Sequence, residues 1–190
     1  MESNPQNSNS ESKKKSGLSL GWLAAFGAVA LLLVLVGMGL VRAREREAPK
    51  KIGAPVPDFT LKSFEGETYT LSELRGKVVL INFWASWCKP CEQEATDLEM
   101  AWRYYQPRGD VVFLGVDWTD TEPKAKAYLE KFEISYPNGP DLGTRISQAY
   151  RTTGVPETFI VDQNGNLAYF KLSPFLSLDE IKAVIDPLLE

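Results

Sequence analysis

The stretch from Val78 to Cys91 constrains the fold of this chain more than any other part of the sequence. Its first six residues, Val-Val-Leu-Ile-Asn-Phe, are almost entirely apolar and predict a buried strand. A short turn follows, and then the sequence Cys-Lys-Pro-Cys at residues 88–91, which is expected to open a helix. The sequence therefore predicts a C-x-x-C motif at the junction between a strand and a helix.

This placement favours redox chemistry at the two cysteines. Residues three apart on a helical turn have Cβ atoms about 5–6 Å apart, and a disulfide needs about 3.5–4.5 Å. A small local change would therefore close or open a bond between Cys88 and Cys91. Unpaired N–H groups and the dipole at a helix N-terminus favour a thiolate on Cys88. Pro90 is tolerated there because the first helical turn does not need its missing N–H.

Other interpretations of the cysteine pair are open at this point. A zinc site needs four ligands, but the chain has two cysteines and no histidine, so we expect no metal and no cofactor. The pair would otherwise be a static disulfide, although so short a loop restrains the unfolded chain little, or two inert buried thiols. The absence of histidine also excludes Ser-His and Cys-His nucleophile pairs.

Residues 83–91, Phe-Trp-Ala-Ser-Trp-Cys-Lys-Pro-Cys, resemble the active site of the thioredoxin superfamily. They are most similar to its membrane-anchored, extracytoplasmic group of the ResA, TlpA and CcmG (DsbE) type. The resemblance covers roughly residues 53–190. It implies an α/β, thioredoxin-like fold in which helices flank a mixed central sheet, with an N-terminal β-hairpin extension. It also implies a redox-active disulfide between Cys88 and Cys91, with Cys88 attacking and Cys91 resolving the mixed disulfide.

Hydrophobic periodicity and turn residues predict the elements of this domain. Helices are expected at 92–105, 122–132 and 144–150, and a last helix begins after the capping box that starts at Ser177. Strands are expected at 78–83 and 111–116, and hairpins pair 59–61 with 68–71 and 159–161 with 167–170. Residues 136–143 are expected to form a loop.

The first 52 residues predict a membrane anchor before the domain. Residues 1–17 are polar and are expected to form a disordered cytoplasmic tail. Residues 18–41 carry no charge, and a helix of that length would span a hydrocarbon core of about 30 Å. We therefore expect a single-pass signal anchor, with a cleavable signal peptide as the alternative, and a charged linker at 42–52. Three lysines precede the span and three arginines follow it, so charge does not set the orientation. An extracytoplasmic domain is what the resemblance implies.

The resemblance also places residues around the dithiol. It implies that the bond between Val155 and Pro156 is cis and that Pro156 faces the cysteines. Glu157 follows, as in the Pro-Glu-Thr of the CcmG type, although an ordinary exposed loop glutamate is equally compatible with the sequence. Trp84 and Trp87 are expected to pack around and shield the site, with a direct substrate contact for Trp87 as the alternative.

Glu94 is a candidate general base. It lies three residues after Cys91, on the same helical face, and the ResA-like pattern Cys-x-x-Cys-x-x-Glu assigns it a functional role. A plain surface glutamate is the competing interpretation. Asn82 stands where thioredoxin has an aspartate and cannot titrate, so any proton transfer at that place falls to another group.

The function implied by the resemblance is the reduction of protein disulfides, including those of apocytochrome c, by a protein that a membrane electron donor recharges. A thiol oxidase or isomerase of the same fold is one alternative, and a thiol-based copper-handling module is another. A peroxiredoxin would need a Pro-x-x-x-Thr-x-x-Cys motif, which the residues before Cys88 do not supply. The net charge of −4 argues against nucleic-acid binding.

Overall fold

A computed structural model of the chain describes residues 20–45 and 50–189, which divide into an N-terminal and a C-terminal unit. The N-terminal unit contains helix α1 (Leu20–Glu45), whose described side chains are those of Trp22 and residues 26–38. Among the described residues we find no helix that is both long and apolar enough to cross a membrane. The predicted disordered tail, the first residues of the predicted span and residues 46–49 of the predicted linker lie outside the described residues.

The C-terminal unit is built on a five-stranded mixed sheet with the strand order β5-β4-β3-β6-β7. Its central strand β3 runs parallel to β4 and antiparallel to β6. β4 and β5 are parallel, whereas β6 and β7 are antiparallel. The strands are β3 (Val78–Trp84), β4 (Val111–Asp117), β5 (Asn138–Pro140), β6 (Glu157–Val161) and β7 (Leu167–Lys171). The predicted mixed sheet is confirmed.

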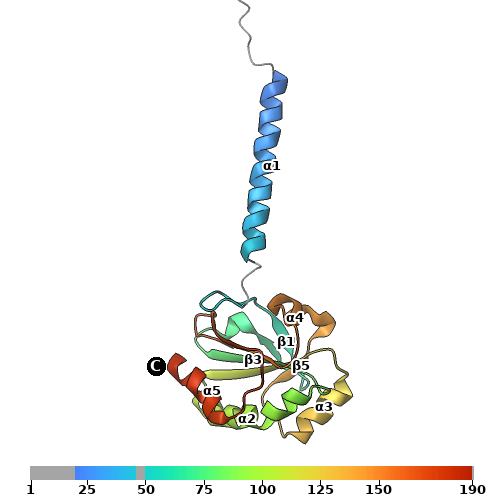
Figure 1. Cartoon of the computed structure of the whole chain (residues 1–190), viewed down its shortest axis with the longest axis vertical. Helices are drawn as coiled ribbons and strands as arrows, with labels where there is room; N and C mark the ends of the chain where they lie inside the picture. The colour runs from blue at the N-terminus through green and yellow to red at the C-terminus, as the bar shows by residue number, and fades with distance from the viewer. Residues whose placement is uncertain (1–19, 46–49, 190) are drawn as a thin grey trace, which may run out of the picture. The chain divides into compact units, whose positions relative to one another are not determined.

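Helices cover both faces of this sheet (Figure 1). One face carries α2 (Lys89–Tyr105), α3 (Glu122–Lys131) and α5 (Leu178–Ile185), and the other carries α4 (Arg145–Tyr150) and a two-stranded hairpin, β1 (Thr60–Lys62) and β2 (Thr68–Thr70). Short 3-10 helices complete the unit at Leu71–Leu74, Gln106–Arg108, Leu142–Thr144 and Asp186–Leu188. The N-terminal hairpin extension is therefore present as predicted.

All seven residues of β3 are buried because helices lie on both sides of it. Alternate side chains point to opposite faces. Ile81 and Phe83 pack against the aromatic ring of Tyr150 and its neighbours on the α4 face, whereas Leu80 packs among Leu98 and other residues on the α2 face. An unbroken apolar run in the sequence thus corresponds to a strand with two dry faces.

Strand β5 was not predicted, and the expected loop at 136–143 is wrong over Asn138–Pro140. Asn-Gly-Pro has the composition of a turn, and proline is usually confined to edge strands. Here the three residues form the sheet edge beside β4, where the Asn138 side chain accepts a hydrogen bond from Trp84 Nε1 at 2.8 Å. A Cβ on Gly115 would lie 1.6 Å from Asn138 Oδ1, so glycine is needed at that strand position.

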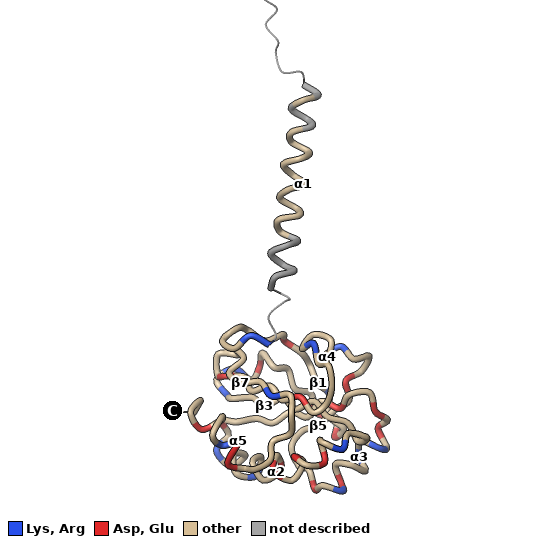
Figure 2. Tube along the Cα trace, in the orientation of Figure 1, with Lys and Arg blue, Asp and Glu red and all other residues tan. Residues whose placement is uncertain are grey.

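The C-terminal half follows its local sequence signals closely. Residues Asp162–Asn166 connect β6 to β7 through a turn in which Gly165 has a positive φ of 79°. Ser177 caps α5, since its side-chain oxygen accepts the Glu180 backbone N–H at 3.2 Å. Lysines and arginines are interspersed with aspartates and glutamates over the domain, as Figure 2 shows. That mixture agrees with the low net charge of the sequence.

Candidate active site

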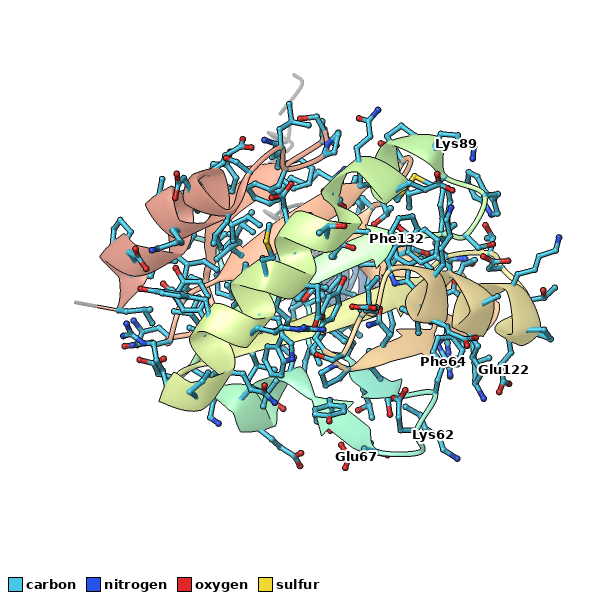
Figure 3. The ribbon with its side chains drawn as sticks, turned by 90° about the horizontal axis from the view of Figure 1, so that it is seen from below. Lys62, Phe64, Glu67, Lys89, Glu122 and Phe132 are labelled. Carbon is cyan, nitrogen blue, oxygen red and sulfur yellow. A yellow bond between two sulfur atoms is a disulfide. The ribbon has the colours of Figure 1, made fainter. Side chains whose placement is uncertain are left out.

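The dithiol lies at the N-terminus of α2, at the edge of the sheet where β3 ends (Figure 3, near Lys89). Cys88 is the N-cap residue, and Cys91 lies in the first turn. The two are joined by a disulfide, with their Cα atoms 5.3 Å apart. The backbone N–H of Cys91 donates to Cys88 Sγ at 3.1 Å. The helix end therefore directs a hydrogen-bond donor at the Cys88 sulfur, which stabilises negative charge there.

Both sulfur-bearing residues are almost covered: Cys88 is 3% exposed and Cys91 is 1% exposed. They pack in one cluster with Trp84, Ala95 and residues of α3, with Val155 against it. Exposure thus separates the two cysteines only slightly. The difference between them is electrostatic, because Cys88 alone occupies the capping position.

Residues 84–88, which we call the dithiol turn, lead into Cys88. The segment after β4 holds this turn in place. Trp118 N–H donates to the Trp84 carbonyl oxygen at 2.8 Å, and Ser86 N–H donates to Asp120 Oδ2 at 2.7 Å. Trp84 is buried, as expected. Trp87 is instead 55% exposed, with its ring 6.3 Å from that of Trp118. The shielding role of Trp87 therefore stays a prediction, and its ring is available at the surface next to Cys88 in the sequence.

The loop at residues 153–157 approaches the dithiol from the start of β6. Its Val155–Pro156 peptide bond is cis, as the resemblance implied, and Val155 packs against the cysteine cluster. Glu157 is not an exposed loop residue: it is the first residue of β6 and is 2% exposed. Its Oε1 accepts the backbone N–H of Thr153 at 2.8 Å and the Thr153 hydroxyl at 2.9 Å.

Glu94 is buried beneath the dithiol, on the face of α2 that also carries Cys91. Only 1% of it is exposed, so the surface-residue interpretation is wrong. Its Oε1 accepts a hydrogen bond from Asn82 Nδ2 at 2.7 Å, and its Oε2 accepts the Phe175 backbone N–H at 3.0 Å. Asn82 also donates to Thr158 Oγ1 at 3.0 Å. The untitratable Asn82 therefore holds the carboxyl group that can titrate.

Burial raises the pKa of Glu94 to about 7, although the hydrogen bonds from Phe175 and Asn82 act in the opposite direction. A carboxyl group with this pKa exchanges protons near neutral pH. It lies one helical turn from Cys91, the cysteine that must lose a proton when a mixed disulfide is resolved. Such a group has the pKa expected of a general base.

Asp117 is a second buried carboxyl group, and the sequence reasoning missed it. It ends β4 opposite Trp84 in the β3–β4 register, is 2% exposed, and leaves Oδ1 without a hydrogen-bond partner. Burial, together with the nearby carboxylates of Asp120 and Asp141, raises the pKa of Asp117 to about 7. An aspartate at the end of an apolar strand was the available signal.

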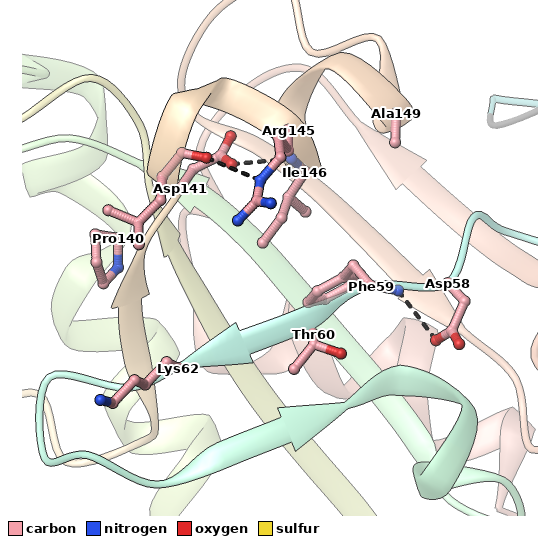
Figure 4. A pocket seen from close by; sticks show the side chains of 10 residues that line it. Asp58, Phe59, Thr60, Lys62, Pro140, Asp141, Arg145, Ile146 and Ala149 are labelled. Atoms are coloured by element: carbon pink, nitrogen blue, oxygen red, sulfur yellow. Dashed lines mark hydrogen bonds between the residues drawn. The ribbon is translucent and has the colours of Figure 1, made fainter.

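Within the described parts of the chain, no three histidine, cysteine, aspartate or glutamate side chains are placed to hold a metal ion. A pocket of about 330 Å³ lies between β1 and α4 (Figure 4). Neither cysteine lines it. The two carboxylates that line this pocket already accept backbone hydrogen bonds. Asp141 accepts the N–H groups of Ile146 and Ser147, and Asp58 accepts the N–H group of Phe59.

Comparisons with known proteins agree with this site. The AhpC/TSA family model matches residues 52–170. The thiol-disulfide oxidoreductase ResA of Bacillus cereus is 32% identical over 143 residues, which are 73% of this chain and 82% of that protein. ResA of Geobacillus thermodenitrificans is 33% identical over 142 residues, or 73% of this chain and 81% of that one. The crystal structure of a thioredoxin-family thiol:disulfide interchange protein from Chlorobium tepidum matches with a TM-score of 0.66 and 25% identity, covering 72% of this chain and 96% of that chain.

These relatives and the geometry of the site indicate the same chemistry. The family match contains both cysteines, Glu94 and the 153–157 loop. A thiolate at a helix N-cap, a second cysteine in the first turn and a buried carboxyl group beneath them suit thiol-disulfide exchange with protein thiols and disulfides. The chain belongs to the AhpC/TSA family and is a thiol-disulfide oxidoreductase of the ResA-like kind.

Proposed function

We propose that this protein is a membrane-anchored, extracytoplasmic reductant of protein disulfides that acts in the maturation of c-type cytochromes. Its substrates are disulfide-bonded proteins such as apocytochrome c, and a membrane electron donor returns it to the dithiol state. Support comes from the resemblance of residues 83–91 to the ResA, TlpA and CcmG type and from relatives near 30% identity that carry the name ResA.

The buried Glu94 carries this proposal. In the dithiol state the Cys88 thiolate attacks a substrate disulfide, and one substrate sulfur leaves as a thiolate that takes up a proton. Glu94 then accepts the proton of Cys91, whose thiolate attacks Cys88 Sγ in the mixed disulfide. The second substrate sulfur leaves and is protonated. Two enzyme thiols are oxidised to one disulfide, and one substrate disulfide is reduced to two thiols.

The order of attack follows from the helix end. Cys88 receives the backbone N–H of Cys91 at its sulfur, so its thiolate is the better stabilised of the two. Cys91→Ser is expected to accumulate mixed disulfides with substrate proteins, and Cys88→Ser is expected to form none. Nonreducing gels with mass spectrometry identify the bonded cysteine. Trapping through Cys91 in the Cys88→Ser variant would reverse the assignment.

The reduction potential of the Cys88–Cys91 pair tests the direction of electron flow. A reductant is expected to have a potential below about −200 mV, in the range of glutaredoxins at about −200 to −230 mV and thioredoxin at about −270 mV. Equilibration of the full chain with defined thiol buffers, followed by quantification of free thiols, measures it. A value of about −180 mV or higher would instead identify an isomerase or oxidase.

The proposed anchor rests on the sequence. Residues 18–41 are uncharged, and residues 42–47, which include three arginines and two glutamates, follow them directly. A helix of 24 residues would be about 36 Å long, more than the hydrocarbon thickness of about 30 Å. The extracytoplasmic side rests on the resemblance, because lysines and arginines are balanced around the run.

A further inference from the structure

One carboxylate oxygen of Glu157 accepts hydrogen bonds from its own loop, and the other faces a residue outside that loop. Oε1 accepts both hydrogen bonds from Thr153, which closes the 153–157 loop on itself. The carboxylate is 2% exposed, at a position where an ionised group needs compensating partners. Val155 of this loop packs against the cysteine cluster, so the position of the Glu157 carboxylate influences where the loop lies beside the dithiol.

Lys50 supplies a cation to the other oxygen. Its Nζ lies 3.2 Å from Glu157 Oε2, and the lysine side chain is 29% exposed. The same Nζ lies 4.9 Å from the centre of the Phe170 ring on β7, which favours a fixed position for the ammonium group. Lys50 therefore connects the N-terminal start of the domain to the loop beside the dithiol, although the two are more than 100 residues apart in the sequence.

We propose that Lys50 is a positioning residue of the active site: through Glu157 it holds the 153–157 loop against the dithiol and so sets the affinity for peptide substrates. An ion pair with one partner buried depends on the other partner, because removing the lysine leaves the buried carboxylate uncompensated. The loop would then shift or take up alternative conformations. The cysteines would keep their bonds to the helix end, since those bonds do not involve Lys50.

The consequence is a specific kinetic change. A residue that orders a binding loop without touching the reacting atoms raises KM and leaves kcat nearly unchanged. Small disulfides that need no loop contact would react with Cys88 at the normal rate. The inference rests on dithiol exchange alone, so a high reduction potential would overturn the proposed direction of the reaction and leave the inference intact.

The test compares Lys50→Gln with wild type in the full chain, using a disulfide-bonded peptide and the small aromatic disulfide DTNB. Lys50→Gln is expected to raise KM for the peptide about 3- to 10-fold, with kcat changed less than about 2-fold and the DTNB rate unchanged. Lys50→Arg keeps the cation and is expected to recover most of the affinity. Lys51→Gln removes a neighbouring exposed lysine and serves as the matched control.

A double-mutant cycle identifies the route. Glu157→Gln is expected to raise KM for the peptide, and Lys50→Gln is expected to add little in that background because the two residues act as one pair. Thermal unfolding of each variant shows whether it is folded. The proposal is overturned if Lys50→Gln behaves like Lys51→Gln, if the two substitutions multiply independently, or if the DTNB rate falls with the peptide rate.

Discussion

At the scale of single residues, Asn82 holds the buried carboxyl group of Glu94, which we propose as the acceptor of the Cys91 proton. Asn82 uses both amide N–H groups, one on Glu94 and one on Thr158, so its orientation is set from two sides. Glu94 in turn is held by Asn82 and by the backbone of Phe175. The carboxyl group is thus fixed in position on the α2 face that also carries Cys91.

Glu94→Gln is expected to slow dithiol exchange about 10- to 10³-fold near neutral pH, since a lost general base costs up to about 10⁴-fold. In wild type the rate should rise with pH through about 7 as Glu94 ionises, because only the carboxylate accepts a proton. The variant should lose that rise. Stopped-flow exchange rates between pH 5 and pH 9 measure both effects. Glu92→Gln, on the same helix but partly exposed, is the control. An unchanged profile in Glu94→Gln would remove this role.

Asp117 predicts a dependence of stability on pH. Because its pKa is raised in the fold, the folded protein keeps a proton that the unfolded chain releases, so the free energy of unfolding falls as pH rises from about 4 to about 7. Asp117→Asn should reduce that fall by up to about 3 kcal/mol. Urea unfolding at pH 5 and pH 8 measures it for both proteins. An equal fall in the two would show that Asp117 ionises normally.

At the scale of elements, the sheet edge at β4 and β5 supports the dithiol turn. Asn138 on β5 joins Trp84 to the edge, and the missing Cβ of Gly115 makes room for the Asn138 amide. Trp84 also stacks on Tyr128 of α3, with ring centres 4.6 Å apart. A short strand of turn-like composition thus fixes the tryptophan at which β3 ends and the dithiol turn begins.

Gly115→Ala is expected to destabilise the fold by about 1–3 kcal/mol, the usual cost of overpacking. The new methyl group would displace the Asn138 amide and break its bond with Trp84. Urea unfolding monitored by circular dichroism measures the stability of the variant. Gly154→Ala is the control for stability, because nothing lies within 4 Å of a Cβ at that glycine. Equal stabilities of the two variants would contradict the prediction.

At the scale of the whole molecule, the proposed anchor makes a prediction about location. Protease added to intact cells stripped of their outer barriers is expected to digest the dithiol domain, because the domain would lie outside the membrane. An antibody against the C-terminus follows the loss, and a cytoplasmic protein shows that the cells stay closed. Full protection of the domain, or its release by a salt wash, would exclude an extracytoplasmic anchored domain.

The sequence by itself determined the strand, the C-x-x-C motif and the helix that follows it. It also determined the β6–β7 hairpin and the capped α5. Each of these depends on residues within a few positions of one another, as with Ser177 and Glu180. Apolar runs, turn residues and caps act through local backbone geometry, and such signals can be read without knowing the rest of the fold.

Only the tertiary structure decided which polar residues are buried and what they face. The same sequence pattern suits an exposed or a buried glutamate at Glu94. Its carboxylate finds its hydrogen-bond donors in Asn82, 12 residues away, and Phe175, 81 residues away. The ion pair between Glu157 and Lys50 likewise joins residues that are far apart in the sequence. Residues of β5 form a strand only because β4 lies beside them. Burial and pKa depend on partners brought together by folding, and those partners are not encoded in the local pattern.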